Sequence, residues 1–251
     1  MPSKPIENEL FISQIPYSKT MLLDAIENKN RVIPELLNSI EQAIQQEENF
    51  FDQQDYSAFI YSIYLLAQFR ESRAYPLLIE FLSTPNERVL ELTGNMFIED
   101  MGRIIASVSG GDISLIQKLI ENTQANELIR TIGLEAIMVL VKNGEKTREE
   151  ILAYFQSLMR EKLERKNSFI WNSLVTCCVD LYPEELIEDL DQLYADGLID
   201  EDFISQERVY EVLSNDKAEI LGKLSNNPFY SYIDNVIQEM EDSSSLIELP
   251  E

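Results

Sequence analysis

The chain has 251 residues, 45% of them hydrophobic, which is enough apolar sequence to bury a large core and too much for a chain that is disordered throughout. Its 45 acidic and 20 basic residues give a formal net charge of −25, which disfavours binding to nucleic acids and to anionic membranes. The chain contains no histidine, which excludes a Ser-His-Asp triad, a Cys-His pair and imidazole ligation of a metal.

The N-terminal part of the sequence predicts a short extension and one pair of helices. Residues 1–17 have neither the basic start nor the apolar run of a secretory signal peptide, and we expect them to be extended. Apolar residues at helical spacing predict helices over 18–29 and 31–46, with Pro34 in the first turn of the second helix. The polar residues 45–55 predict a loop between this pair and the next.

The stretch LLAQFRESRAYPLLIEFL, residues 65–82, places a proline within an apolar helical pattern. Proline is tolerated in the first turn of a helix, where the backbone N–H has no intrahelical partner, so the stretch predicts two helices joined by an elbow. The first helix ends near Arg70, and Ser72 can cap the second. Glu71 and Arg73 lie at the elbow, where they either contact a binding partner or are simply solvated.

Comparable elbows follow at intervals of about 37 residues, a period that is typical of helix-pair repeats. Each elbow combines a helix stop with a helix start: Gly110-Gly111 before Asp112, Asn143-Gly144 before the capping residue Thr147, and Pro183 at the first position of a helix. An array of such hairpins buries helices that are apolar nearly all round, such as residues 169–182. The sequence therefore predicts an all-α fold of the α-solenoid type, built from helical hairpin repeats.

The predicted organisation has four segments: an N-terminal extension (1–17), a helical repeat domain (18–225), a terminal helix (226–240) and a disordered acidic tail (241–251). From Asp180 to Glu251, 20 acidic residues oppose 3 basic residues, a net charge of −17. This charge either favours a basic or neutral protein partner or serves only solubility.

The two cysteines, Cys177 and Cys178, are neighbours in an apolar run. Adjacent cysteines seldom form a disulfide because the geometry is strained, so we expect buried thiols in a cytoplasmic protein. No stretch reaches the roughly 18 uninterrupted apolar residues of a membrane span. No phosphate-binding glycine loop is present either, and we expect no cofactor.

Two clusters are candidates for binding a partner. Glu99, Asp100 and Arg103 lie in an apolar neighbourhood. The last two, three residues apart on a helix, predict an ion pair that either holds repeats in register or forms a polar hot spot on a concave surface. The single tryptophan, Trp171, and its neighbour Asn172 predict core packing, with an exposed anchor for a partner as the alternative.

A third candidate is the acidic run over residues 189–203, which includes Asp196 and Asp200. The run does not place oxygen ligands at the alternating positions of a calcium loop. We therefore expect a solvated helix end and an acidic loop, with weak magnesium or calcium binding as the alternative.

Four phrases of the sequence, LAQFRESRAYPLLIEFL, IEDMGRIIASVSGGD, WNSLVTCCVDLYPEEL and YADGLIDEDFI, resemble a bacterial family of uncharacterised, HEAT-like α-helical proteins. The resemblance spans about residues 15–215 and implies an α-solenoid of HEAT-like repeats with no established activity. Longer members of that family carry a C-terminal SEC-C zinc motif, built from cysteines with a further cysteine or histidine. No cysteine follows Cys178 and the chain has no histidine, so we do not expect that module here.

These features favour a non-catalytic helical-repeat scaffold or adaptor that binds another protein. One alternative is an acidic inhibitor that mimics nucleic acid and targets a basic nucleic-acid-binding protein, because the C-terminal third is so acidic. Another is an enzyme that works through carboxylates and a divalent metal. Salt-dependent binding would favour the mimic, and a stoichiometric metal site would favour the enzyme.

Overall fold

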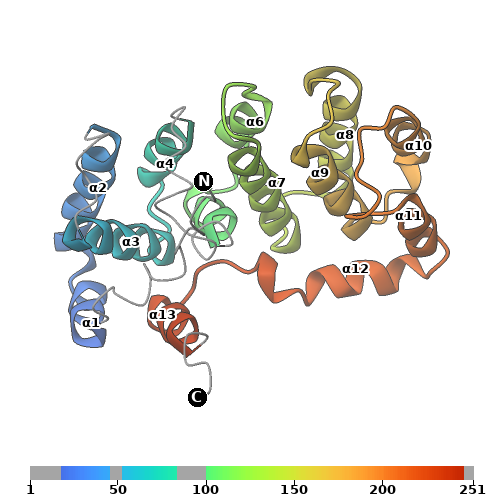
Figure 1. Ribbon diagram of the computed structural model, residues 1–251. Coiled ribbons are helices and arrows are strands. Elements are labelled where there is room, and N and C mark those ends of the chain that lie inside the picture. The colour runs from blue at the N-terminus through green and yellow to red at the C-terminus, as the bar shows by residue number, and fades with distance from the viewer. Residues whose placement is uncertain (1–17, 46–52, 84–99, 246–251) are drawn as a thin grey trace, which may run out of the picture. The chain divides into compact units, whose positions relative to one another are not determined.

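The computed structural model describes residues 18–45, 53–83 and 100–245, and all regular structure within these ranges is helical (Figure 1). The predicted N-terminal extension, most of the predicted loop over 45–55, Glu99 and the final residues 246–251 lie outside the described residues. The chain divides into two compact units. The first unit comprises Met1–Gly110 and Tyr232–Glu251, and the second unit comprises Gly111–Ser231.

The first unit contains helices from both ends of the chain. They are α1 (Lys19–Glu27), α2 (Lys29–Gln45), α3 (Gln53–Gln68), α4 (Ala74–Ser83), a helix through residues 100–109, and α13 (Val236–Ser245). Helix α2 packs against α1, α3 and α4, whereas α13 packs against α1 and α3. The fully buried side chains of Ile40, Leu66 and Leu78 form part of the core between α2, α3 and α4.

The second unit is a continuous run of short helices. They are α6 (Ser114–Glu121), α7 (Glu127–Lys142), α8 (Arg148–Ser157), the π-helical turn η3 (Leu158–Lys162), α9 (Phe169–Asp180), the 3₁₀ turn η4 (Glu184–Leu186), α10 (Ile187–Ala195), α11 (Gln206–Leu213), α12 (Lys217–Ser225) and the 3₁₀ turn η5 (Pro228–Tyr230). Helix α7 packs against α6, α8 and α9 (Figure 1). A Cβ atom at Gly133 would lie 2.6 Å from Ile120 Cγ1, so glycine at this position of α7 allows α6 to approach closely.

The predicted chemistry of the elbows is confirmed at several positions. The proline of the 65–82 stretch, Pro76, lies in the first turn of α4. Asp112 Oδ1 accepts a hydrogen bond of 2.8 Å from the backbone N–H of Ser114, at the start of α6. Thr147 Oγ1 accepts one of 3.1 Å from the N–H of Glu150, at the start of α8.

A left-handed residue follows the first helix of each of four hairpins. At two of these positions the residue is glycine, Gly110 with φ 59° and Gly144 with φ 76°. At the other two it is Arg70 with φ 54° and Tyr182 with φ 55°, where a side chain disfavours this backbone conformation. Tertiary contacts hold both side chains, because Arg70 donates to the carbonyl of Ile233 and the Tyr182 hydroxyl donates to that of Leu213.

Three expected boundaries differ from the structure. Pro34 lies beyond the first turn of its helix, because α2 already begins at Lys29. Pro183 precedes the short 3₁₀ turn η4, and the α-helix begins only at Ile187. The terminal helix begins ten residues later than expected, at Val236, and continues to Ser245, so the first residues of the expected disordered tail are helical.

Candidate functional site at the C-terminal segment

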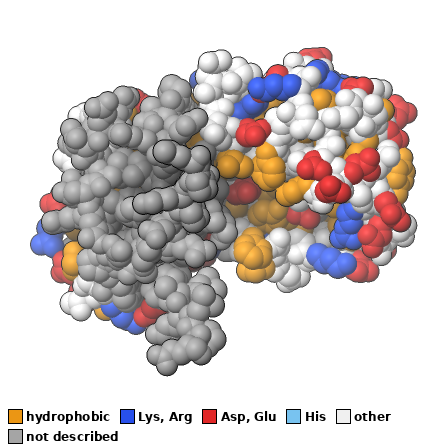
Figure 2. Space-filling model, in the orientation of Figure 1, with side chains coloured by type: hydrophobic (Ala, Val, Ile, Leu, Met, Phe, Trp, Pro, Cys, Tyr) orange, Lys and Arg blue, Asp and Glu red, His pale blue; other side chains and the backbone are white. Residues whose placement is uncertain are grey.

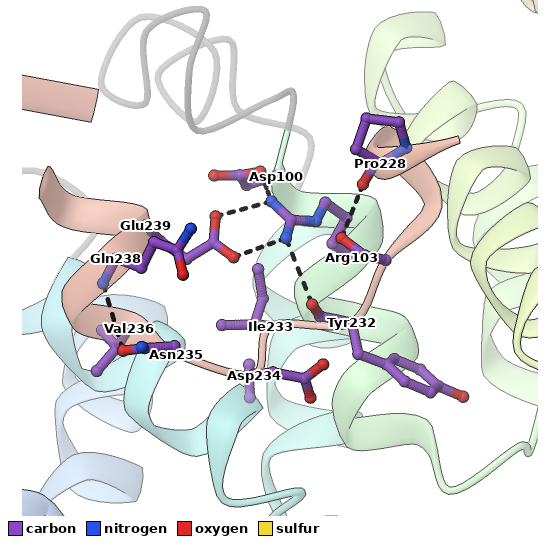
Figure 3. A network of polar contacts seen from close by, with 12 residues as sticks. Asp100, Arg103, Pro228, Tyr232, Ile233, Asp234, Asn235, Val236, Gln238 and Glu239 are labelled. Atoms are coloured by element: carbon purple, nitrogen blue, oxygen red, sulfur yellow. Dashed lines mark hydrogen bonds and ion pairs between the residues drawn. The ribbon is translucent and has the colours of Figure 1, made fainter. Parts of the chain in front are cut away.

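Residues Tyr232–Ser245, here called the C-terminal segment, begin with a non-helical stretch over 232–235 and continue as α13. Polar side chains from other parts of the first unit contact this segment, and we call four of them the clasp surface: Gln68, Arg70, Arg103 and Ser107. The first two lie at the end of α3 and just after it, and the last two lie on the helix through residues 100–109. Figure 3 shows the segment and Arg103.

Side chains of the clasp surface satisfy main-chain groups of the segment. Ser107 Oγ accepts a hydrogen bond of 3.1 Å from the N–H of Ile233, and Arg70 Nη1 donates one of 2.7 Å to the carbonyl of the same residue. Gln68 Oε1 accepts one of 2.7 Å from the N–H of Val236. The backbone groups of a non-helical stretch have no partners within the stretch itself. The clasp surface therefore supplies the hydrogen bonds that other main-chain groups supply in a helix or a sheet.

Arg103 binds the segment through a carboxylate and a carbonyl (Figure 3). Its guanidinium makes a bidentate contact with Glu239, with donor–acceptor distances of 2.7 and 2.9 Å, and donates at 3.3 Å to the carbonyl of Tyr232. Asp100 Oδ1 accepts a further bond of 2.7 Å from Arg103, which confirms the predicted i,i+3 ion pair. The hydroxyl of Tyr64 on α3 donates at 2.6 Å to the other oxygen of Asp100.

Arg103 and Tyr64 keep their protons around neutral pH. Burial opposes the charge of Arg103, but the hydrogen bonds that Arg103 donates to Glu239, together with the carboxylate of Asp100, outweigh it and raise the pKa of the guanidinium. Burial, followed by the Asp100 carboxylate, raises the pKa of Tyr64 well above its usual range, so the phenol stays protonated and keeps donating. The cluster therefore presents permanent donors and a permanent positive charge, which suit binding better than proton transfer.

The segment contributes two apolar anchors and weaker outer contacts. The side chains of Ile233 and Val236 are both fully buried. The ion pairs of Asp234 with Arg70 and of Glu241 with Lys19 lie closer to the solvent, where such pairs contribute little to stability. Burial of the two anchors and the Arg103 contact are therefore the main attachments of the segment.

The second unit contains a polar pocket of about 290 Å³. It is lined by Thr123, Ala125, Glu127, Arg130, Glu164, Lys166, Asn167 and Ser168. Most of its charge is already matched, because Arg130 makes a bidentate contact of 2.7 and 3.0 Å with Glu164, and Glu127 accepts a bond of 2.7 Å from the N–H of Phe169. The hydroxyl oxygen of Ser168 is buried without a hydrogen-bond partner within the described part of the chain.

Trp171 is fully buried, as the core-packing interpretation expects, and it is not an exposed anchor. Its indole N–H donates to the carbonyls of Lys166 at 3.1 Å and Glu164 at 3.3 Å, so it fixes the loop that precedes α9. Asn172 is also buried, and its side-chain oxygen accepts a bond of 2.9 Å from the N–H of Asp200. These residues organise the second unit from inside.

The two acidic candidates lie near this core on the surface. Asp196 pairs with Arg165, whose guanidinium also lies 5.7 Å from the ring centroid of Trp171. The carboxylate of Asp200 accepts a bond of 3.0 Å from the N–H of Asp202 and so stabilises its own loop. The structure thus brings together four of the candidate residues, Trp171, Asn172, Asp196 and Asp200, around the start of α9.

Glu71 and Arg73 pair with each other at their elbow, at distances of 2.8 and 2.9 Å. The hydrogen bond from Arg73 lowers the pKa of Glu71, and the same contact raises the pKa of Arg73. Arg73 is exposed, so it remains accessible from the solvent. Glu99, the remaining candidate, lies outside the described residues.

Asp100 and Arg103 could be recognised as candidates from the sequence. The other residues that join the clasp surface to the C-terminal segment, including Gln68, Ser107 and Glu239, could not be recognised in this way. The helix cap Asn235, whose side chain accepts bonds from the backbone N–H groups of Ile237 and Gln238, was the one local signal that could have placed the start of α13. The C-terminal segment contacts α3 and the helix through 100–109, which lie far from it in the sequence. No local sequence pattern therefore predicts these contacts.

Two further properties concern only the described residues. Within these ranges, no group of three or more Cys, Asp or Glu side chains is arranged to hold a metal ion. None of the helices in the described ranges is long and apolar enough to cross a membrane.

An all-α chain whose first unit is completed by its own C-terminal segment is the class of protein that these features define. Residues 4–246 match the family described as "Protein of unknown function (DUF1186)", and the chain belongs to this family. An uncharacterized protein of Chlamydia muridarum is 35% identical over 224 residues, covering 89% of this chain and 84% of the relative. An uncharacterized protein of Chlamydia trachomatis serovar D is 36% identical over 219 residues, covering 86% of each chain. No solved structure matches the chain.

Proposed function

We propose that the protein is a non-catalytic helical-repeat scaffold that binds another protein through a segment of that partner. The observation that carries this proposal is the clasp surface, whose side chains bind main-chain groups and one carboxylate of a segment that is non-helical over 232–235 and helical from Val236. Recognition of a protein segment needs these elements: backbone hydrogen bonds for affinity and side-chain sites for specificity.

The scaffold is proposed to be an α-solenoid of HEAT-like hairpins. The recurrence of a left-handed residue at positions 70, 110, 144 and 182 supports a repeated hairpin. So do side-chain contacts between residues about one period apart: Tyr64 with Asp100 over 36 residues, Arg130 with Glu164 over 34 and Arg148 with Glu185 over 37. Such spacing arises when each hairpin packs against the next one in the chain.

Absence of catalysis is part of the same proposal. A chain without histidine lacks the usual base for a serine or cysteine nucleophile. Cys177 and Cys178 are buried, and burial raises the pKa of both thiols, so neither is a ready nucleophile around neutral pH. Buried free thiols also suit the cytoplasm, where we propose that the protein acts.

The partner is proposed to be basic or neutral overall, because a net charge of −25 repels acidic proteins. The bound segment of that partner needs one carboxylate, to occupy the position of Glu239 beside Arg103. A basic protein with one acidic residue in an otherwise apolar segment satisfies both conditions.

An acidic mimic of nucleic acid is less well supported. Many carboxylates of residues 184–202 are engaged by basic side chains: Glu184 by Lys217, Glu185 by Arg148, Asp189 by Arg160, and Asp196 by Arg165. On the face shown in Figure 2, the described acidic side chains are interspersed with basic and hydrophobic ones. A mimic of the phosphate backbone needs rows of unpaired negative charge.

Affinity capture from cells of the native host, using the full-length chain, tests this function. We expect a protein to be captured by the wild-type chain and by a Lys223→Ala control, because Lys223 is exposed in the second unit and pairs with Glu219 on its own helix. Capture should fall when Gln68 and Ser107 are both replaced by alanine, which removes two acceptors for main-chain N–H groups. Equal capture by both variants, or turnover of a metabolite without any captured protein, would contradict the proposal.

A further inference from the structure

The C-terminal segment is attached to the first unit as a bound peptide is attached to its receptor. Its main-chain contacts at Ile233 and Val236 go to side chains on α3, to Arg70 in the elbow after α3, and to the helix through 100–109. Within an ordinary tertiary element, main-chain groups bond mostly to other main-chain groups. Side chains that reach out to a foreign backbone are characteristic of a recognition surface.

The segment also shows which side chains the surface accepts. An apolar residue, Ile233, is fully buried in the non-helical stretch, and a second one, Val236, is fully buried where the helix begins. Glu239 follows after three more residues, one turn into the helix, and binds Arg103. Asn235 caps the helix, so the pattern is apolar, cap, apolar and carboxylate at positions 1, 3, 4 and 7.

We propose that the clasp surface is a protein-binding site occupied in cis by the C-terminal segment, and that a partner protein inserts a segment of the same pattern in its place. The inference rests on the proposed function and adds the partner's chemistry and the regulation of binding. The occupant is a segment that enters in non-helical form, buries two apolar side chains three residues apart, and starts a helix that presents a carboxylate to Arg103.

Part of the attachment of the segment lies close to the solvent. Its outer ion pairs are exposed, with 77% exposure of the Asp234 side chain and 49% of the Glu241 side chain, so they resist displacement weakly. Both the segment and the clasp surface belong to the first unit.

The cis segment sets the apparent affinity of the partner. A tethered ligand competes at an effective concentration on the order of millimolar, so an isolated partner segment binds weakly while the tether is occupied. The apparent dissociation constant equals the intrinsic one divided by the fraction of molecules in which the surface is open. A substitution that weakens the attachment of the C-terminal segment and leaves the clasp surface unchanged should therefore increase the affinity for a partner segment on a separate molecule.

The first test uses a fluorescent peptide with the sequence of residues 229–245 and full-length protein. An Ile233→Asp/Val236→Asp variant places charges at both buried anchors and should bind the peptide about tenfold or more tightly than the wild-type chain, because the surface is open more often. A Gln238→Asp variant, which changes an exposed position of the same helix, should bind as the wild type does. Adding Gln68→Ala and Ser107→Ala to the opened variant should weaken binding again.

A second measurement uses the wild-type chain and does not depend on the folding of a variant. The backbone N–H groups of Ile233 and Val236 are protected from hydrogen exchange by their hydrogen bonds to Ser107 and Gln68. An excess of the unlabelled peptide should accelerate exchange at these two positions and leave the N–H groups of α7 unchanged. A peptide with aspartate in place of both anchors should have no effect.

Unchanged exchange together with equal peptide binding by the wild-type and opened chains would overturn the inference. A concentration-dependent dimer that exchanges its C-terminal segments, without binding the peptide, would assign the surface to a second copy of the chain and overturn it as well. Continued capture of a host protein in either case would leave the scaffold proposal standing. If the peptide displaces the C-terminal segment as expected but no host protein is captured, only the scaffold proposal is contradicted.

Discussion

Buried or partly buried arginines organise both units, but they reach across very different lengths of chain. In the second unit, Arg130 binds Glu164 over 34 residues and Arg148 binds Glu185 over 37 residues. In the first unit, Arg103 binds Glu239 over 136 residues. The contacts over 34 and 37 residues join one hairpin to the next. The contact over 136 residues joins the C-terminal segment to the rest of the first unit.

The two arginines of the second unit share a geometry. Each donates Nε to a main-chain carbonyl, of Ile120 for Arg130 and of Leu181 for Arg148, and turns the fork of its guanidinium to a glutamate. Arg103 uses its fork for two carboxylates and a carbonyl. The second unit is therefore held by contacts between consecutive hairpins, and the first unit is closed by the C-terminal segment, which we propose a partner replaces.

Deleting residues 232–251 should have the largest effect and should separate the two units. The first unit would lose the buried side chains of Ile233 and Val236, worth about 3–6 kcal/mol of unfolding free energy together. Hydrogen exchange during urea titration measures the loss for each unit, and we expect the loss in α3 and in the helix through 100–109. An equal loss of protection in α7 and α9 would show that the second unit depends on the C-terminal segment as much as the first unit does.

Trp171→Ala should destabilise the second unit almost as strongly. The fully buried indole leaves a large cavity and two unsatisfied carbonyls, and truncations of this kind reduce unfolding free energy by about 3–5 kcal/mol. Intrinsic tryptophan fluorescence disappears with the only tryptophan, so circular dichroism in urea is the measurement. Trp171→Phe, which fills most of the cavity, is the control and should lose clearly less stability.

Much of the fold could be predicted because its signals are local. The hairpins follow from proline in a first turn at Pro76, glycine at Gly110 and Gly144, and capping by Thr147. Trp171 could be assigned to the core from the apolar sequence around it. Each of these signals concerns the conformation of a few residues, which neighbouring residues largely determine.

The clasp surface could not be predicted in the same way. Arg103 and Asp100 were visible as a charged pair in an apolar helix, but their second partner, Glu239, lies 136 residues from Arg103. Gln68 and Ser107 are ordinary polar residues in sequence, and only the position of the C-terminal segment gives them a role. Positions of αL residues were also hidden at Arg70 and Tyr182, where tertiary contacts override the usual preference for glycine.

Arg130→Ala should have an intermediate effect, restricted to the second unit. The guanidinium is almost fully buried, and its removal leaves the carboxylate of Glu164 and the carbonyl of Ile120 without their donor, at about 2–3 kcal/mol of unfolding free energy. Arg130→Lys keeps the charge but not the fork, so it should recover only part of the loss. Urea unfolding of both variants measures the difference, and a full recovery with lysine would show that charge alone matters.

Acidification should weaken the same contact, with a smaller effect. The hydrogen bond from Arg130 lowers the pKa of Glu164 below its ordinary value of about 4.3. The stabilisation is therefore complete above the unfolded-state pKa and is lost as the pH falls through the lower folded-state pKa. Unfolding free energy of the wild-type chain should drop more steeply than that of Arg130→Ala as the pH falls below about 4.3. Parallel pH profiles would rule out a contribution from this pair.

Asp180→Asn should have the smallest effect and the opposite sign. Burial raises the pKa of Asp180, although the hydroxyl of Tyr230, 2.9 Å away, favours the ionised form and partly offsets the shift. A folded-state pKa above the unfolded-state value means that ionisation weakens the fold as the pH rises through the folded-state value. Asparagine removes that charge and can still accept from Tyr230, so we expect a gain of at most about 1 kcal/mol at pH 7. The gain should vanish at a pH low enough to protonate Asp180, because two neutral side chains are then compared, and a gain independent of pH would assign the effect to packing.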